Sequence, residues 1–93
     1  MPLPQGTRGP EYRQALAAAL DAIRAHGADF LVVSFGADTF EGDPISNFAL
    51  TRDDYAPIAA EIASLALPTL IVMEGGYAVA DLGDNVAAFL SGI

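Results

Sequence analysis

Two short, almost wholly apolar segments set the strongest limit on what this chain can fold into. Residues 30–35 read FLVVSF and residues 68–73 read PTLIVM. Runs of this kind are typical of strands that are covered on both faces, as in a parallel sheet. Two strands alone leave open edges and bare faces, which proteins normally protect. The pattern therefore predicts a piece of a larger α/β sheet, and an isolated copy would need a partner copy or would tend to aggregate.

Helical periodicity fills the segments around the two strands. A first helix is predicted from about Glu11 to the residue before Gly27, and a second follows Thr51, which would cap it together with Asp54. Pro57 predicts either an irregular first turn or a regular helix that begins near Asp54. A third helix is predicted over about 79–91. The apolar positions expected to face the core are Tyr12, Leu16, Leu20 and Ile23 in the first helix, Tyr55, Ile58, Ile62 and Leu65 in the second, and Val79, Leu82, Val86, Phe89 and Leu90 in the third.

The remaining segments are predicted to be irregular. Residues 1–10, rich in Pro and Gly, are interpreted as an extended lead-in, and residues 36–50 as a long loop. The predicted order is α-β-α-β-α, with a right-handed βαβ unit in its middle. Residues 1–93 are therefore expected to form a single partial domain of the α/β class.

Charge and metal-binding residues exclude several classes of function. Four Arg, no Lys and twelve acidic side chains give a net charge of −8, which argues against a nucleic-acid partner. Without Cys, and with His26 as its one His, the chain cannot build a self-contained zinc site from thiolates or from several imidazoles. Its apolar runs, about seven residues at most, are too short to span a bilayer. We expect a cytoplasmic protein with no membrane partner.

A ligand-binding or catalytic site is expected beyond the carboxyl ends of the two strands, where open parallel sheets bind ligands. Asp38 follows the first strand and Tyr77 follows the second, so neighbouring strands would bring both to one crevice. Asp38 could bind a metal or act as a base, and Tyr77, after Gly75 and Gly76, could donate a hydrogen bond to a substrate oxygen. The residue types alone favour structural roles, a loop cap for Asp38 and an aromatic lid on the core for Tyr77.

The residues of these two loops match motifs of a known family. Residues 36–44 read GADTFEGDP and residues 74–77 read EGGY. Together they resemble the zinc-dependent deacetylases, the family of the histone deacetylases and acetylpolyamine amidohydrolases. The lead-in also resembles the family's segment before the first helix, and residues 76–86 are most similar to the acetylpolyamine amidohydrolase branch. The resemblance covers essentially all of the chain. It implies the C-terminal segment of a larger domain with the parallel-sheet fold of arginases and deacetylases.

The resemblance implies a role for each matching residue. Asp38 corresponds to one of three protein ligands of the family's catalytic zinc, and Tyr77 to the tyrosine that hydrogen-bonds the scissile carbonyl and then its oxyanion. Gly75 and Gly76 would form a wall that lets the acetyl-amine group come close to the metal. Ile45 would line the entrance of the substrate tunnel. The implied reaction is metal-assisted hydrolysis of an acetylated amine.

The resemblance also implies that essential residues lie outside this sequence. In the family, the other two zinc ligands and a tandem His pair of acid/base residues lie upstream, and His26 is in the wrong element to replace them. We therefore expect a truncated amidohydrolase that is inactive alone, does not bind zinc tightly by itself, and needs the missing upstream segment. The alternative is a non-catalytic α/β assembly module that folds as a homo-oligomer. A separate upstream chain that completes the site is a third possibility.

Overall fold

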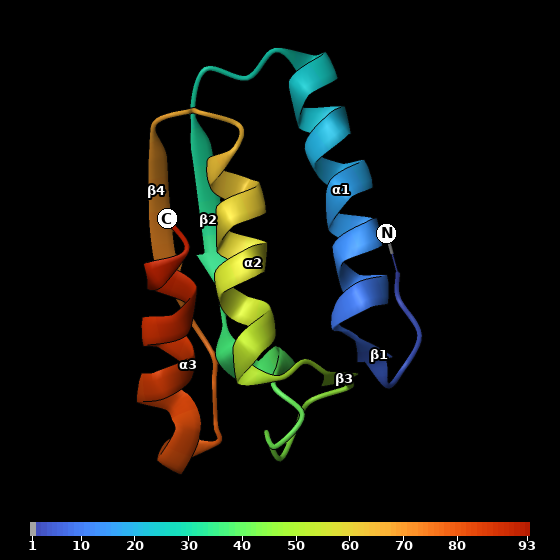
Figure 1. Cartoon of the computed structure of the whole chain (residues 1–93), viewed down its shortest axis with the longest axis vertical. Helices are drawn as coiled ribbons and strands as arrows, with labels where there is room; N and C mark the ends of the chain where they lie inside the picture. Colours follow the sequence, from blue (N-terminus) through green and yellow to red (C-terminus); the bar gives the residue numbers. More distant parts are fainter. Residues whose placement is uncertain (1) are drawn as a thin grey trace.

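The two apolar segments form neighbouring parallel strands, β2 and β4 (Figure 1). The structure is a computed structural model that describes residues 2–93. None of the helices in these residues has the length and apolarity needed to cross a membrane. The predicted α/β class and the order of the long elements are confirmed. The elements are β1 (Thr7–Arg8), α1 (Gly9–His26), β2 (Leu31–Phe35), the 3-10 helix η1 (Ala37–Thr39), β3 (Phe48–Ala49), α2 (Arg52–Ala63), β4 (Thr69–Met73) and α3 (Val79–Ser91).

The central pair of strands directs both following loops to one edge. β2 and β4 pair along their whole length, with Leu31 opposite Thr69 and Phe35 opposite Met73. α2 and α3 lie over the same face of the pair, and α1 stands beside α2 (Figure 1). Since the strands are parallel, the segments that leave their carboxyl ends emerge together.

The core lies between the sheet and the helices α2 and α3. Phe35 of β2 stacks on Phe89 of α3 with 4.0 Å between ring centroids, and it meets Tyr55 of α2 edge-on at 5.9 Å. The other buried members of this cluster are small or aliphatic: Ala37, Leu50, Ile58 and Ala59. The aromatic cluster anchors the carboxyl end of β2, from which the Asp38 loop departs.

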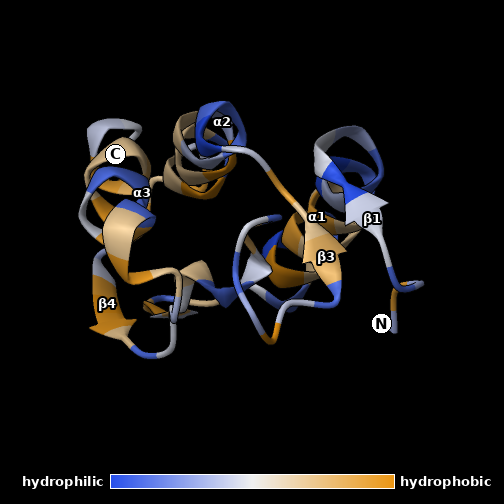
Figure 2. Cartoon of the chain, turned by 90° about the horizontal axis from the view of Figure 1, so that it is seen from below, coloured by the Kyte–Doolittle hydropathy of each residue, from blue (hydrophilic) through white to orange (hydrophobic). Residues whose placement is uncertain are grey.

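The opposite face of the sheet is bare. Its apolar side chains include Val32 of β2, which is 63% exposed, and Leu70 of β4, which is 59% exposed; Val72 is exposed as well. In Figure 2, α2 and α3 lie on one side of β4, which is coloured as hydrophobic, and no helix of the described residues lies on its other side. The composition of these strands is typical of a sheet that is covered on both faces, but in residues 2–93 helices cover only one face. This is what we expect for a piece of a larger sheet.

The N-terminal lead-in holds more regular structure than its sequence predicts. Thr7 and Arg8 form β1, which pairs in parallel with β3 through Thr7 and Phe48. Helix α1 begins at Gly9 instead of near Glu11. β3 in turn lies inside the segment that was expected to be a loop. Strands of two residues carry no detectable alternation, so no pattern could have indicated this pairing.

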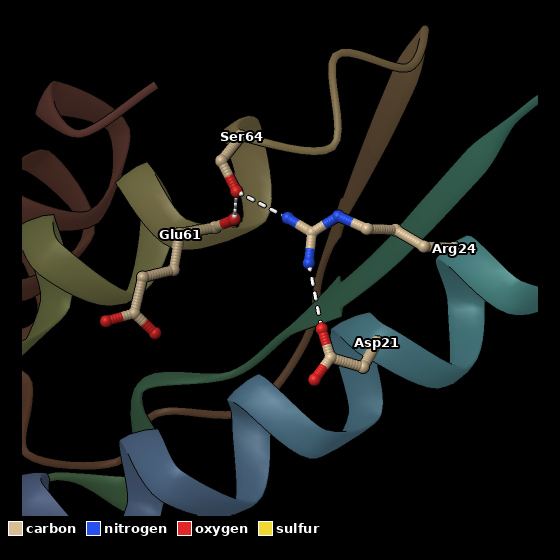
Figure 3. A network of polar contacts seen from close by, with 4 residues as sticks. All are labelled: Asp21, Arg24, Glu61 and Ser64. Atoms are coloured by element: carbon tan, nitrogen blue, oxygen red, sulfur yellow. Dashed lines mark hydrogen bonds and ion pairs between the residues drawn. The ribbon is translucent and has the colours of Figure 1, made fainter.

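A polar network joins the C-terminal ends of α1 and α2 (Figure 3). The Arg24 guanidinium donates to the Asp21 carboxylate at 3.2 Å and to the Ser64 hydroxyl at 3.1 Å, and that hydroxyl donates to the backbone oxygen of Glu61. The side chains of Asp21, Arg24 and Ser64 are exposed, and exposed ion pairs stabilise a fold by only about 0–1 kcal/mol. The network therefore orients α1 against α2 and adds little to stability.

The N-terminus of α2 carries the predicted cap. The Asp54 carboxylate accepts the backbone N–H of Thr51 at 2.7 Å and its hydroxyl at 3.1 Å. The helix nevertheless begins at Arg52 and continues through Pro57, so the expected irregular start, or a start near Asp54, is wrong. The helix tolerates Pro57 because proline removes only one backbone N–H donor. Pro57 also lies close to the first turn, which the hydrogen bonds of the Asp54 carboxylate stabilise.

Helix α3 turns only part of its predicted apolar face toward the core: Leu82, Val86 and Phe89 pack there, and Val79 and Leu90 do not. Val79 is 84% exposed and Leu90 is 48% exposed, whereas Phe89 and Asn85 are buried. Asn85 takes a central position although neither of its side-chain polar atoms has a partner among residues 2–93. Val79 and Leu90 share one line along the helix, which is rotated away from the line of Phe89. The apolar stripe is therefore wider than the surface that α2 and the sheet cover.

Candidate active site

The loops that follow β2 and β4 meet at one edge of the sheet. Asp38 lies in η1, directly after β2, and Gly75 follows β4. The backbone N–H of Glu74 donates to the carbonyl of Phe35 at 2.8 Å, which extends the strand pairing to the start of both loops. A β-carbon on Gly75, whose φ is +71°, would lie 2.8 Å from Oδ2 of Asp38. Glycine at this position lets the Asp38 carboxylate pack directly against the backbone.

A pocket of about 380 Å³ opens beside these loops. Asp38, Gly75 and Tyr77 all line it, and the rest of the lining is mostly apolar and aromatic and comes mainly from α1, β2 and α2, with Phe89 from α3. Tyr77 is 50% exposed, so its hydroxyl is not sealed in the core. The structure thus brings together the two side chains that strand order alone suggested would share a crevice, while their chemical roles remain predictions.

Two of the predicted site residues lie outside the lining of this pocket. Gly76 has a φ of +98°, and a β-carbon there would lie 2.6 Å from a methyl group of Leu82. The absence of a side chain at Gly76 therefore serves the packing of the loop on α3. Ile45 lies in the loop before β3 and is 62% exposed. The wall role of Gly76 and the tunnel role of Ile45 remain predictions.

Asp43 joins the loop of Ile45 to the loop of Tyr77. Its side chain is buried, and its Oδ2 accepts the backbone N–H of Tyr77 at 2.6 Å and that of Ala78 at 3.2 Å. Its Oδ1 accepts the backbone N–H of Ile45 at 2.9 Å. The sequence analysis placed Asp43 in a long loop and missed the contacts with the second loop. No local signal could reveal them, because the partners are 34 and 35 residues away.

The charge of Asp38 acts on two tyrosines that line the same pocket. Burial, and secondly the Asp38 carboxylate, raises the pKa of Tyr12. Burial raises the pKa of Tyr55 to about 12, while its 3.1 Å hydrogen bond with the Thr39 hydroxyl acts in the opposite direction. Both phenols are therefore neutral at physiological pH, and the pocket holds them as hydrogen-bonding groups without added charge.

Ionisation of Tyr55 is expected to destabilise the fold in alkaline solution. A phenol in the unfolded chain has a pKa of about 10, and that of folded Tyr55 is about 12. The unfolded chain therefore loses its proton first, so the stability contributed by Tyr55 is complete below about pH 10 and is lost as the pH rises toward 12. The tyrosinate absorbance of the chain, minus that of Tyr55→Phe, measures this titration. A native Tyr55 that ionises with an ordinary pKa would contradict it.

Gly75→Ala is expected to lower the free energy of unfolding by about 1–2 kcal/mol, because alanine is strained at positive φ. Its methyl group would also meet the Asp38 carboxylate. Gly83→Ala is the matched control: Gly83 lies within α3 in open space, so alanine should raise stability by about 0.5–1 kcal/mol. Urea unfolding measures both variants. If Gly75→Ala were as stable as the unaltered chain, the close approach to Asp38 would be wrong.

Two acidic residues, Asp38 and Glu74, line this pocket, and carboxylates are common zinc ligands. Asp38 is the one that the family resemblance matches to a metal ligand. Within residues 2–93, no three His, Cys, Asp or Glu side chains gather closely enough to hold one. His26 ends α1 and does not line the pocket. A catalytic zinc needs three protein ligands and one open position. Residues 2–93 can therefore supply one ligand of such a site, Asp38, but not all three.

Comparison with known proteins identifies the family. The family described as the histone deacetylase domain matches residues 1–93. The chain belongs to the histone deacetylase domain family. The match spans the whole sequence, and it confirms the resemblance carried by the two loop motifs.

Sequence identities to individual proteins indicate which branch of the histone deacetylase domain family this chain resembles most. Acetylpolyamine amidohydrolase of Mycoplana ramosa is 48% identical over 92 residues, which covers 99% of this chain and 27% of that protein. Acetylpolyamine amidohydrolase 2 of Pseudomonas aeruginosa is also 48% identical, over 91 residues. Histone deacetylase 8 of Danio rerio is 32% identical over 82 residues. The higher identities support the predicted similarity to the acetylpolyamine amidohydrolase branch.

A solved structure shows the same fold for this member of the histone deacetylase domain family. The crystal structure of acetylpolyamine aminohydrolase from Burkholderia pseudomallei matches with a TM-score of 0.95 at 36% sequence identity. The match covers 99% of this chain and 27% of that one. The chain therefore has the deacetylase-like α/β fold and spans about a quarter of the length of the relatives it matches.

Proposed function

We propose that residues 1–93 carry part of the active site of a zinc-dependent amidohydrolase that removes acetyl groups from acetylpolyamines or acetyl-lysine-like amides. One observation carries the proposal: Asp38 and Tyr77 line one pocket beyond the carboxyl ends of two parallel strands. The names of the relatives, acetylpolyamine amidohydrolases at 48% identity, support this substrate class. The high negative charge of the chain is compatible with cationic polyamines.

Each residue has a defined part in this proposal. Asp38 supplies one carboxylate ligand, and the absence of a side chain at Gly75 leaves room for that carboxylate against the backbone. The Tyr77 hydroxyl donates a hydrogen bond to the substrate carbonyl, and the bond strengthens as negative charge develops on that oxygen. Gly75 and Gly76 leave room for the acetyl-amine group, and Ile45 lies at the mouth of the substrate tunnel. A zinc ion bound at this site would act as a Lewis acid on the substrate carbonyl and would lower the pKa of its bound water molecule.

The proposal includes that this chain alone does not catalyse the reaction. One carboxylate is too few for a catalytic zinc, so the other ligands and the acid/base His residues come from an upstream segment, as the family resemblance implies. In this arrangement residues 1–93 are the C-terminal segment of one larger cytoplasmic domain. The bare face of β2 and β4 is then the surface against which the rest of that domain packs.

A chimera tests the proposal. Residues 1–93 replace the matching segment of the Mycoplana ramosa acetylpolyamine amidohydrolase, and the product is loaded with zinc and assayed with an acetylated polyamine. We expect turnover by the chimera and none by the isolated chain under the same conditions. Asp38→Asn in the chimera is expected to remove zinc from the site, as measured by metal analysis of the purified protein.

Two results would contradict parts of this proposal separately. A folded, zinc-loaded chimera without turnover would overturn the assignment of this segment to a deacetylase site. Metal-dependent turnover by the isolated chain would instead overturn the claim that the chain is incomplete. The Glu41→Gln variant, in the same loop as Asp38 but exposed, is the matched control for loss of one carboxylate.

The bare sheet face favours a second candidate function, a non-catalytic module that assembles with copies of itself. Val32, Leu70 and Val72 would then lie in the interface. Light scattering at micromolar concentration should show a dimer that the double substitution Val32→Thr and Leu70→Thr converts to a monomer. A monomer that melts cooperatively without these substitutions would rule this candidate out.

A further inference from the structure

Asp43 is a buried carboxylate with all of its recorded partners on the backbone of two separate loops. It is 6% exposed, and both of its oxygens accept hydrogen bonds. Oδ2 takes two consecutive amides, those of Tyr77 and Ala78, and Oδ1 takes the amide of Ile45. A buried charge is costly unless it is hydrogen-bonded, so this arrangement strongly favours one relative placement of the two loops.

We propose that Asp43 is the positioning residue for Tyr77, and that it sets the distance between Tyr77 and the tunnel mouth at Ile45. The inference rests on the proposed function, in which Tyr77 stabilises the oxyanion. Asp43 does not line the pocket of Asp38 and Tyr77. It therefore acts on the reaction only through the backbone that it holds.

The backbone geometry explains why a carboxylate is suited to this task. Tyr77 and Ala78 directly precede α3, which begins at Val79, and a negative charge near a helix N-terminus is stabilised by the helix dipole. Gly75 and Gly76 both have positive φ, so the loop before Tyr77 includes two residues with wide conformational freedom. The charge-assisted hydrogen bonds of Asp43 fix the end of that loop.

An asparagine at position 43 cannot make the same contacts. Its amide has one oxygen that accepts and one nitrogen that only donates. Its oxygen can therefore accept either the N–H of Ile45 or the N–H groups of Tyr77 and Ala78. The N–H groups on the other side then face the side-chain NH2 group of the asparagine, which cannot accept a hydrogen bond. Asp43→Asn thus loosens one loop against the other while it keeps the size of the side chain.

A double-mutant cycle in the chimera separates positioning from general stability. Asp43→Asn is expected to lower kcat roughly 10- to 100-fold, because small misplacements of a catalytic group have effects of this size, with KM nearly unchanged. In a Tyr77→Phe background the same substitution is expected to change kcat less than about twofold, since Asp43 would act through the missing hydroxyl. Equal effects in both backgrounds would overturn the proposal. Glu41→Gln, in the same loop, should leave kcat unchanged.

Hydrogen exchange on the 93-residue chain tests the geometry without any activity. The amide of Tyr77 is expected to exchange slowly and to resonate downfield although its side chain is half exposed, and Asp43→Asn should remove this protection while Glu41→Gln retains it. Fast exchange at Tyr77 in the unaltered chain overturns the proposal even if Asp43→Asn does not fold. If the chimera is inactive but the Tyr77 amide is protected as described, the proposed function fails and the loop-positioning role of Asp43 stands.

Discussion

Tyr77→Phe is expected to lower kcat of the chimera by on the order of 10²–10³, the loss typical of one missing oxyanion donor. The substitution removes only the hydroxyl, so the ring keeps its place at the pocket and KM should change little. The backbone N–H of Tyr77 stays bonded to Asp43. The loss therefore reports the phenolic hydrogen bond alone, because a bond that forms fully only in the transition state affects kcat more than substrate binding.

Tyr12→Phe is the matched control for this prediction. Tyr12 lines the same pocket from α1, but the proposed function gives its hydroxyl no part in the reaction. Steady-state kinetics with an acetylated polyamine should show a large loss of kcat for Tyr77→Phe and a small one for Tyr12→Phe. Equal losses would mean that the pocket needs phenols for its structure, and the assignment of Tyr77 as the oxyanion donor would be wrong.

Phe89→Ala is expected to lower the free energy of unfolding by about 3–5 kcal/mol, the usual cost of truncating a buried phenylalanine. Phe89 is 1% exposed and stacks on Phe35 at 4.0 Å. The cavity would open between α3 and the sheet, at the carboxyl end of β2. Since a domain of this size is only marginally stable, the variant should be largely unfolded at moderate temperature.

Leu90→Ala provides the neighbouring comparison in the same helix. Leu90 is 48% exposed, so its truncation should cost much less than that of Phe89, within about 1 kcal/mol. Thermal melting followed by circular dichroism compares the two. If the two variants melted together, the stacked pair of Phe35 and Phe89 would not be the centre of the core.

The sequence was sufficient for features that repeat along the chain or lie next to one another in it. The apolar runs predicted β2 and β4, and the cap of α2 by Asp54 followed from spacing alone. Since the loops that follow neighbouring parallel strands leave the sheet at one edge, the sequence predicted that Asp38 and Tyr77 share a crevice, and both line one pocket.

Features that depend on distant partners could not be predicted in this way. Asp43 belongs to a common turn sequence, and its role appears only when Tyr77 is folded against it. The burial of Asn85 and the exposure of Val79 depend on the direction from which α2 and the sheet approach α3. Hydrophobicity along one helix cannot specify that direction when its apolar stripe is wider than the contact.

The parallel pairing of β2 with β4 also has a kinetic consequence. The whole of α2 and its flanking loops separate the two strands in the sequence, so neither strand can pair until that segment has folded back. The entropy lost in closing this long connection precedes any gain from strand contacts, which makes such pairing slow. During that interval the apolar β2 has no pairing partner among residues 2–93, and association with other chains competes with folding.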